Sequence, residues 1–489
     1  MAQELTVDKF INNEVVKKCL KDLKDAFPPG GKSLIVSDVL DNEGHQYVNL
    51  VQKGGGVLGV ALVGYTYILE EMNIRFIRLA GTSAGAINTA LMAVTGTKQE
   101  AKSVQVLDAI CKLKFIELVD GHPVARMIIS KFITHQDFVV KVKKWIIGIL
   151  LTFVLLMAGN FIFLGLQHAI PKVSIFTKLF FVLTGLWLLV IGATAAYIAT
   201  LLKRLKNSGF GINPGDYFYD WIKKLLIANG VKTVTDLNRK AAAPVPGLHL
   251  RVPNAEELNG LEGDVTFISS ELVSQNKIQF PEMWNLFRKN IDELEPAGFI
   301  RASMSIPIFF ESYFIDNIPC TDEAVKKIWK EKFDEDDPPS VARFVDGGIL
   351  SNFPINLFYN PKVITPRLPS FGIDLDESGP GDTGKHADKW SLPGYFGRMF
   401  NTIRSYYDKD FLLKNKVFKE GIGTIHLQGY NWLNFFLTDQ DKIDMFAKGA
   451  VAAKDFLLNF NWDNYKEDRD KMRKELIKEQ IPNDKNPEN

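Results

Sequence analysis

The sequence predicts an α/β fold with a mainly parallel central sheet, interrupted by an α-helical transmembrane hairpin. Short apolar segments alternate with glycine turns and helical patterns, which is the arrangement of βαβ units. Residues 145–166 and 179–202, in contrast, contain no charged side chain. At about 1.5 Å of rise per residue, each of these stretches is long enough to cross a hydrocarbon core about 30 Å thick.

The composition excludes several classes of site. The chain of 489 residues has 58 Lys and Arg against 57 Asp and Glu, so no overall basic field favours a nucleic-acid partner. Its three cysteines are far apart and lack C-x-x-C spacing, so neither a disulfide framework nor a zinc site is indicated. The acidic run 334–337 is typical of a surface loop. We expect no metal, no cofactor and a reducing compartment, and the amino terminus lacks the pattern of a cleaved signal.

The first βαβ pattern contains a glycine loop. A helical pattern at 5–27 is followed by a strand at 47–52, the loop Gly54-Gly55-Gly56-Val57-Leu58-Gly59, and a helix at 60–71. Such a loop presents backbone N–H groups that bind either a phosphate or a developing oxyanion. It lacks the Gly-Lys-Ser/Thr ending of a phosphate loop and fits G-x-G-x-x-G only if Gly54, Gly56 and Gly59 are selected. We therefore prefer the oxyanion interpretation over dinucleotide binding.

A serine turn follows at Gly81-Thr82-Ser83-Ala84-Gly85, between an apolar strand at 76–80 and a helix at 86–93. A serine on a tight strand-to-helix turn needs small neighbours, and the following helix adds its positive N-terminal end. An ordinary glycine turn is the alternative. The context favours Ser83 as a nucleophile.

The apolar stretches predict an antiparallel hairpin, because the connection at 167–178 is short. Three basic residues lie just before the first span and three just after the second, against two in the connection. The positive-inside rule therefore predicts a membrane protein with two spans whose catalytic domain and termini are cytoplasmic. A buried helix pair in a soluble core, or a hairpin that enters one leaflet, is the alternative. Asn160 is expected to face the partner helix or an oligomer.

The second half of the chain returns to α/β patterning. A short strand delivers Asp346 into Asp346-Gly347-Gly348, and the carboxyl ends of strands are where the sites of α/β sheets gather. An aspartate that caps its own turn is the alternative role for Asp346. Further elements are expected at the following positions: helices at 124–132, 295–304 and 443–456, strands at 265–269 and 370–375, a loop reaching residue 388, and a charged, frayed tail from 466.

The three motifs, in this order, resemble those of the patatin-like phospholipases. Residues 302–307, Asn352, Pro354 and the late helix also fit that family. Leu58 departs from it, since many members carry Arg or Lys there, and the hairpin interrupts the catalytic domain. The resemblance implies a three-layer patatin-like fold. The expected organisation is an N-terminal helical accessory segment (1–46), a catalytic domain in two parts (47–140 and 209–458), the transmembrane hairpin with its basic flanks (141–208) and a charged C-terminal tail (459–489).

The resemblance also implies a Ser-Asp dyad. Ser83 would attack an ester carbonyl and Asp346 would accept its proton, so that an acyl-enzyme forms. The remaining residues would have two roles: an oxyanion hole from Gly54, Gly55, Gly56 and Ala84, and support of the motifs by Gly59, Gly81, Gly85, Gly347 and Gly348.

The chain order leaves a second catalytic arrangement open, in which His386 or His426 completes a triad with Ser83 and Asp346.

The implied activity is that of a membrane-anchored serine lipid acyl hydrolase of the phospholipase A or lysophospholipase type. Membrane phospholipids would be both its substrate and its anchor. An acyltransferase that uses the same dyad and a noncatalytic lipid-binding membrane protein are the alternatives.

Overall fold

The computed structural model describes residues 5–123, 138–207 apart from 168, 209–252, 261–360, 366–376 and 408–480, with the single positions 126, 363, 399, 402 and 406. The predicted helix at 124–132 and the predicted loop to residue 388 lie largely outside these residues. The chain forms two compact units. The first combines residues 1–119, 215–307 and 312–489, and the second combines 120–214 with 308–311.

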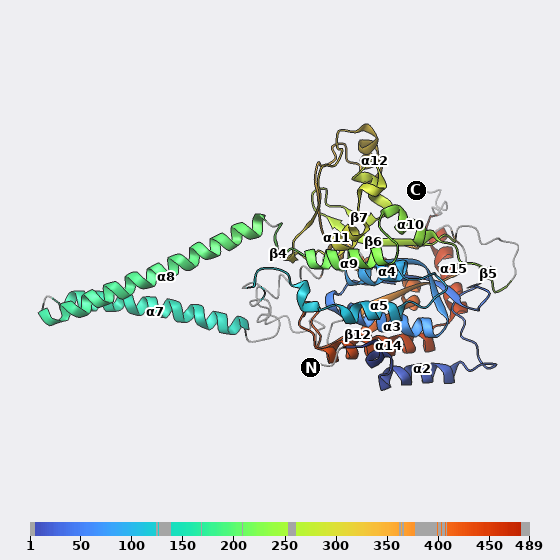
Figure 1. The fold of residues 1–489 in the computed structure, drawn as a ribbon, viewed down its shortest axis with the longest axis horizontal. Coiled ribbons are helices and arrows are strands. Elements are labelled where there is room, and N and C mark those ends of the chain that lie inside the picture. Colours follow the sequence, from blue (N-terminus) through green and yellow to red (C-terminus); the bar gives the residue numbers. More distant parts are fainter. Residues whose placement is uncertain are drawn as a thin grey trace, which may run out of the picture. The chain divides into compact units, whose positions relative to one another are not determined.

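The first unit is built on a sheet whose central strands are parallel, as predicted (Figure 1). The strand order is β12-β11-β2-β3-β6-β10-β9, and the pairs from β12 to β6 are parallel. The antiparallel pairs are β6 with β10 and β7, β10 with β9, and β1 with β2 and β5. The strands are β1 (Val39–Leu40), β2 (Gln46–Gln52), β3 (Ile74–Thr82), β5 (His249–Leu250), β6 (Asp264–Glu271), β7 (Lys277–Phe280), β9 (Tyr313–Ile315), β10 (Ala342–Asp346), β11 (Ser370–Asp376) and β12 (Ile422–His426).

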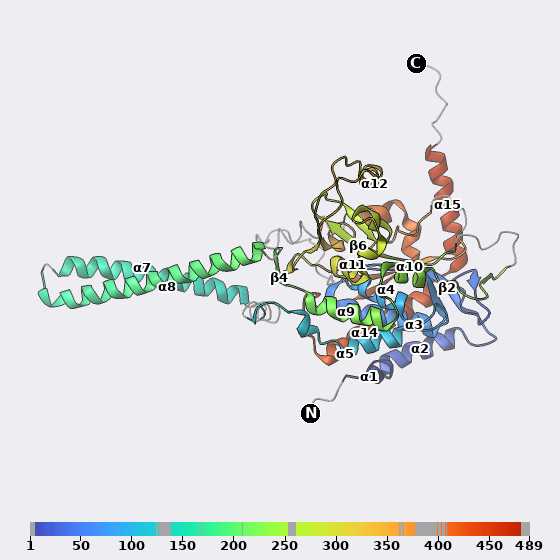
Figure 2. The same cartoon turned by 45° about the horizontal axis from the view of Figure 1, so that its top comes forward.

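Helices and irregular segments cover both faces of this sheet, because its central strands are apolar on both sides. On one face α3 and α14 pack side by side, with α14 against β12 and α2 beyond α14 (Figures 1 and 2). On the other, Val51 and Ala80 of the sheet pack against Phe353, Ile355 and Phe418. The helices are α1 (Val7–Ile11), α2 (Glu14–Ala26), α3 (Gly59–Glu71), α4 (Ala84–Val94), α5 (Ser103–Lys112), α9 (Asp216–Ala228), α10 (Val234–Ala242), α11 (Pro296–Ser303), α12 (Glu323–Phe333), α14 (Asp439–Asn459) and α15 (Trp462–Gln480).

Two predictions about the ends of the chain were wrong. The single helix expected at 5–27 is two helices, because the Asn13 side chain accepts the Val15 N–H and starts α2 anew. The tail expected to fray from 466 forms α15 as far as Gln480. Tertiary contacts hold this helix: Trp462 Nε1 donates to Asp38 Oδ1 at 2.8 Å, and Tyr465 is buried.

The second unit contains the apolar hairpin of α7 (Phe138–Leu166) and α8 (Ser174–Asn207), and β4 (Gly211–Asn213) paired with β8 (Ile308–Phe310). Both helices are longer than the predicted spans, and their connection shortens to 167–173. The Asn160 side chain donates to the Thr184 hydroxyl, so it faces the partner helix. The Thr177 hydroxyl donates to the Phe163 carbonyl at 3.1 Å.

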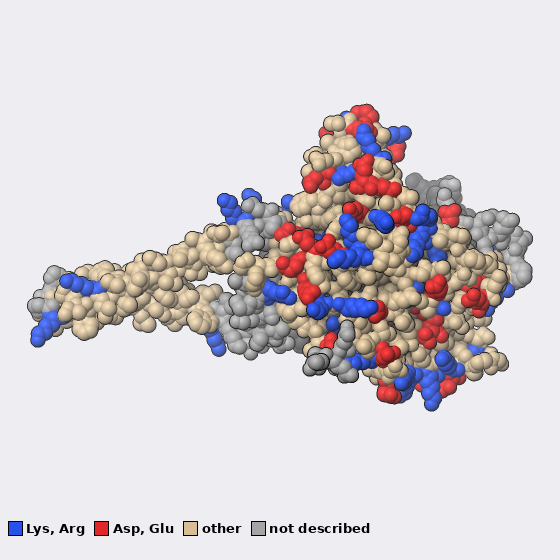
Figure 3. Space-filling model, viewed as in Figure 1, with Lys and Arg blue, Asp and Glu red and all other residues tan. Residues whose placement is uncertain are grey.

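Both helices are long and apolar enough to cross a membrane. Only 6% of either apolar segment is buried, whereas a helix pair in the core of a soluble protein would be mostly buried. The exposed surface of α7 and α8 is uncharged over most of its length, with basic side chains near the helix ends (Figure 3).

We expect Gly64→Ala to destabilise the first unit by about 1 to 3 kcal/mol, because overpacking outweighs the better helix propensity of alanine. A Cβ at Gly64 would lie 2.0 Å from the Phe446 carbonyl oxygen of α14. Thermal unfolding followed by circular dichroism measures the change. Lys448→Ala on the exposed face of α14 is the control, and equal melting temperatures for the two variants would contradict the prediction.

Candidate active site

Ser83 lies at the junction of β3 and α4 in a strained backbone conformation. Its φ of 54° and ψ of −119° fall in a region that residues with a side chain rarely adopt. A Cβ at Gly81 would lie 2.3 Å from the Gly85 carbonyl oxygen, and one at Gly85 would lie 2.2 Å from the Gln52 carbonyl oxygen. The crowding expected from the sequence is therefore present, and only glycine fits at both positions.

Ser303 holds this turn in place. The Ser83 N–H donates to Ser303 Oγ at 3.0 Å, and Ser303 Oγ donates in turn to the Ile268 carbonyl at 2.6 Å. Ser303 is fully buried. The sequence did not predict this role, although Ser303 lies in the 302–307 motif. A small polar residue at the end of an apolar helix is the feature of the sequence that points to it.

The glycine loop lies against the serine turn. A Cβ at Gly54 would lie 3.0 Å from Ser83 Cβ. Gly56 has a positive φ of 54°, and a Cβ there would lie 2.2 Å from the Trp432 carbonyl oxygen, so glycine is required. Within the described part of the chain, no acceptor takes the N–H of Gly55 or Gly56.

Gly54 is a correction to the predicted oxyanion hole. Its N–H donates to the Asn352 carbonyl at 3.0 Å, and the Asn352 side chain donates to the Gly54 carbonyl at 3.2 Å. Gly54 is therefore engaged in joining two loops and does not offer a donor to a ligand in this structure.

Asp346 reaches the site from an unexpected direction. β10 runs antiparallel to β6, whereas β3 runs parallel to it. The register pairs Thr82 with Ile268 and Asp346 with Ser269, so Ser83 and Asp346 end up level with each other. They lie two strand spacings apart, which is about 10 Å between backbones.

The Asp346 carboxylate is buried and oriented by its own turn. Oδ1 accepts the Gly348 N–H at 2.7 Å, and the Asp346 N–H donates to the Ser305 carbonyl at 2.8 Å. A Cβ at Gly347 would lie 2.1 Å from the Ile268 carbonyl oxygen, so the turn packs tightly against β6 because residue 347 has no side chain. The Gly348 contact also suits a turn aspartate, so the strand register is the observation that links Asp346 to Ser83.

The loop after Asp346 completes the convergence of the three motifs. The Thr82 hydroxyl donates to the Ser351 carbonyl at 3.0 Å, next to the two contacts between Asn352 and Gly54. Residues 54, 82 and 351–352, which are far apart in sequence, are thus joined by hydrogen bonds around Ser83.

A small apolar cavity adjoins Ser83. Its volume is about 60 Å³, room for about two water molecules. A lipid acyl chain would enter only if side chains moved. The wall includes Gly56, Ser83 and Ala84, and its apolar part comes from Ile87, Ile110, Leu113, Phe115, Leu118, Phe218, Trp221, Met304, Ile306 and Phe435.

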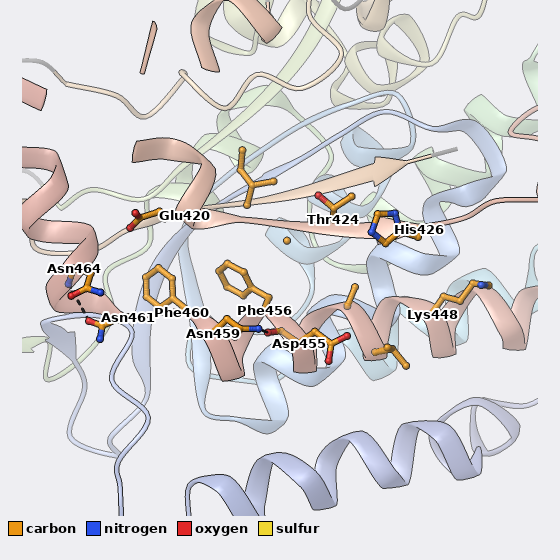
Figure 4. A pocket seen from close by; sticks show the side chains of 14 residues that line it. Glu420, Thr424, His426, Lys448, Asp455, Phe456, Asn459, Phe460, Asn461 and Asn464 are labelled. Carbon is orange, nitrogen blue, oxygen red and sulfur yellow. Dashed lines mark hydrogen bonds between the residues drawn. The ribbon is translucent and has the colours of Figure 1, made fainter. Parts of the chain in front are cut away.

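Of the two histidines of the alternative triad, the structure describes His426, and it does not lie beside Ser83. His426 lies on β12, three strand positions or about 14 Å from β3, and its Nδ1 lies 3.1 Å from Asp376 Oδ2. It lines a separate groove with Lys448 and Asp455 of α14 (Figure 4). His386 lies outside the described residues. Among the residues that are described, no group of three or more His, Cys, Asp or Glu side chains is arranged to hold a metal ion.

Comparison with known proteins identifies the family of the chain. A family model described as "Patatin-like phospholipase" matches residues 50–359, more than half of the chain. The chain is 25% identical over 419 residues to the uncharacterized protein YqhO of Bacillus subtilis, covering 85% of this chain and all of that protein. VipD from Legionella pneumophila matches at 13% identity over 89% of this chain and 72% of that one, with a TM-score of 0.35, too low to support a structural argument.

We expect Ser303→Ala to cost about 1 to 3 kcal/mol, because the buried Ser83 N–H loses its acceptor. A fluorophosphonate probe should then label Ser83 more slowly. Thr66→Val is the control, since it removes a buried hydroxyl that bonds to Val63 and Ser103 outside the site. Equal labelling rates for the two variants would contradict the role given to Ser303.

Proposed function

The chain belongs to the patatin-like phospholipase family, and from that premise we propose that it is a membrane-anchored serine lipid acyl hydrolase of the phospholipase A or lysophospholipase type. The family has lipid acyl hydrolysis as its general activity. One observation supports the finer proposal above all: the glycine loop, the serine turn and the loop after Asp346 are joined by hydrogen bonds around Ser83.

Ser83 Oγ attacks the ester carbonyl of the lipid while Asp346 accepts its proton. The N–H groups of Gly55 and Gly56, with Ala84 at the helix N-terminus, bind the oxyanion, and one such donor lowers the barrier by about 3 to 4 kcal/mol. Collapse breaks the ester bond, returns the proton to the leaving alkoxide, and leaves an acyl-serine. Asp346 then activates water, and hydrolysis releases the fatty acid and restores Ser83.

The apolar cavity supports a lipid acyl group as the part of the substrate bound beside Ser83, because its wall is largely hydrocarbon. The hairpin of α7 and α8 would anchor the enzyme with two spans and keep the catalytic unit and both termini on the cytoplasmic side. Anchoring raises the effective concentration of membrane phospholipid at the site.

We expect Ser83→Ala and Asp346→Asn each to lower fatty-acid release from mixed phospholipid vesicles by at least about 10³-fold, because each removes one member of the dyad. His426→Gln is the control and should retain wild-type release. Full release by Ser83→Ala would refute the dyad. Transfer to an added alcohol that exceeds hydrolysis would identify an acyltransferase instead.

We expect deletion of residues 145–202 to release the protein from carbonate-washed membranes, because it removes both apolar stretches. Full-length protein should stay in the pellet, as assayed by immunoblotting of both fractions. Full-length protein that is soluble without detergent would contradict the two-span anchor.

A further inference from the structure

A buried carboxylate outside all three motifs contacts the loop that joins them. Asp408 lies in the helical segment 408–414 and is 6% exposed. It lies beyond residues 50–359, which match the family model.

Asp408 binds two residues of the loop that follows Asp346. Its Oδ1 accepts the Ser351 hydroxyl at 2.9 Å, and its Oδ2 accepts the Phe353 N–H at 2.8 Å. The backbone of Asn352 also stabilises the ionised form of this carboxylate and so lowers its pKa. One side chain therefore fixes the conformation of residues 351–353 through both of its oxygens.

Those residues in turn hold the other two motifs. The Ser351 carbonyl accepts the Thr82 hydroxyl at 3.0 Å, one residue before Ser83. The Asn352 backbone and side chain both bond to Gly54, one residue before Gly55. A shift of the 351–353 segment would thus move the nucleophile relative to the oxyanion donors.

We propose that Asp408 is a positioning residue that aligns the serine turn with the glycine loop through residues 351–353. This inference rests on the hydrolase function proposed above, because alignment matters only if Ser83 and the loop act together. Rate losses of about 10²-fold follow from misplacements of about 1 Å in such sites.

Burial raises the pKa of Asp408 to about 6, although the donors from the loop and the charge of Lys277 act in the opposite direction. At pH 7 and above the side chain is therefore ionised and accepts hydrogen bonds at both oxygens. Burying a carboxylate is costly, and the donors that offset this cost come from the loop that contacts both other motifs.

The test compares Asp408→Asn with Asp410→Asn in the full-length, detergent-solubilised protein. An asparagine presents an NH₂ group in place of one acceptor oxygen, so it cannot take every donor. Asp410 lies on the same helical segment and pairs with Lys414 at 2.7 Å on the surface. Hydrolysis of p-nitrophenyl butyrate gives kcat and KM, and hydrogen exchange with mass spectrometry follows peptides that cover residues 52–58 and 347–354.

We expect Asp408→Asn to lower kcat by about 10- to 100-fold with KM within twofold, and to speed exchange in both peptides, whereas Asp410→Asn changes neither. A kcat within twofold of wild type, or unchanged exchange at 52–58, would overturn the proposal. If Asp408→Asn does not fold, Ser351→Ala replaces it, and an unchanged kcat and exchange rate would overturn the proposal equally. Absence of Ser83-dependent hydrolysis in the wild type would refute the proposed function, and the exchange data would still decide whether Asp408 holds the loops.

Discussion

The strained backbone of Ser83 is the constraint on which the surrounding structure depends. A residue with positive φ at the end of a strand persists only where its neighbours over-determine it. Here Ser303 takes the N–H of Ser83, and β2 lies so close to α4 that Gly85 has no room for a side chain. The conformation of Ser83 therefore depends on the close packing of β2 against α4 and on the hydrogen bond to Ser303.

The mixed direction of the sheet has a functional consequence. If β10 ran parallel to β6, Asp346 would leave the sheet at the carboxyl edge in the same direction as Ser83. Instead β10 approaches the site from the opposite direction, and the pairing of Asp346 with Ser269 determines where Asp346 lies along β6. A slip of one residue would turn Asp346 to the other face of the sheet, so the tight fit of Gly347 against Ile268 protects the site.

One buried polar side chain in each unit shows how such groups find partners. In the hairpin, the Asn160 side chain donates to the Thr184 hydroxyl of the other helix. In the catalytic unit, the carboxylate of Asp408 is buried among backbone and hydroxyl donors. The partner in the hairpin is thus a hydroxyl of the neighbouring helix, whereas the partners in the catalytic unit are a hydroxyl and a backbone N–H group of one loop.

The amino-acid sequence by itself determined the features that depend on neighbouring residues. The serine turn, the glycine loop, the parallel central strands and the two long apolar helices follow from local spacing, since glycine geometry and hydrophobic period act over a few residues. Only the tertiary structure decided the direction of β10, the capture of the Gly54 N–H by Asn352, the helical tail α15, and the contacts of Ser303 and Asp408. Each of these depends on partners far away in the chain, such as Gly54 and Asn352 at a separation of 298 positions, and no local pattern encodes such pairing.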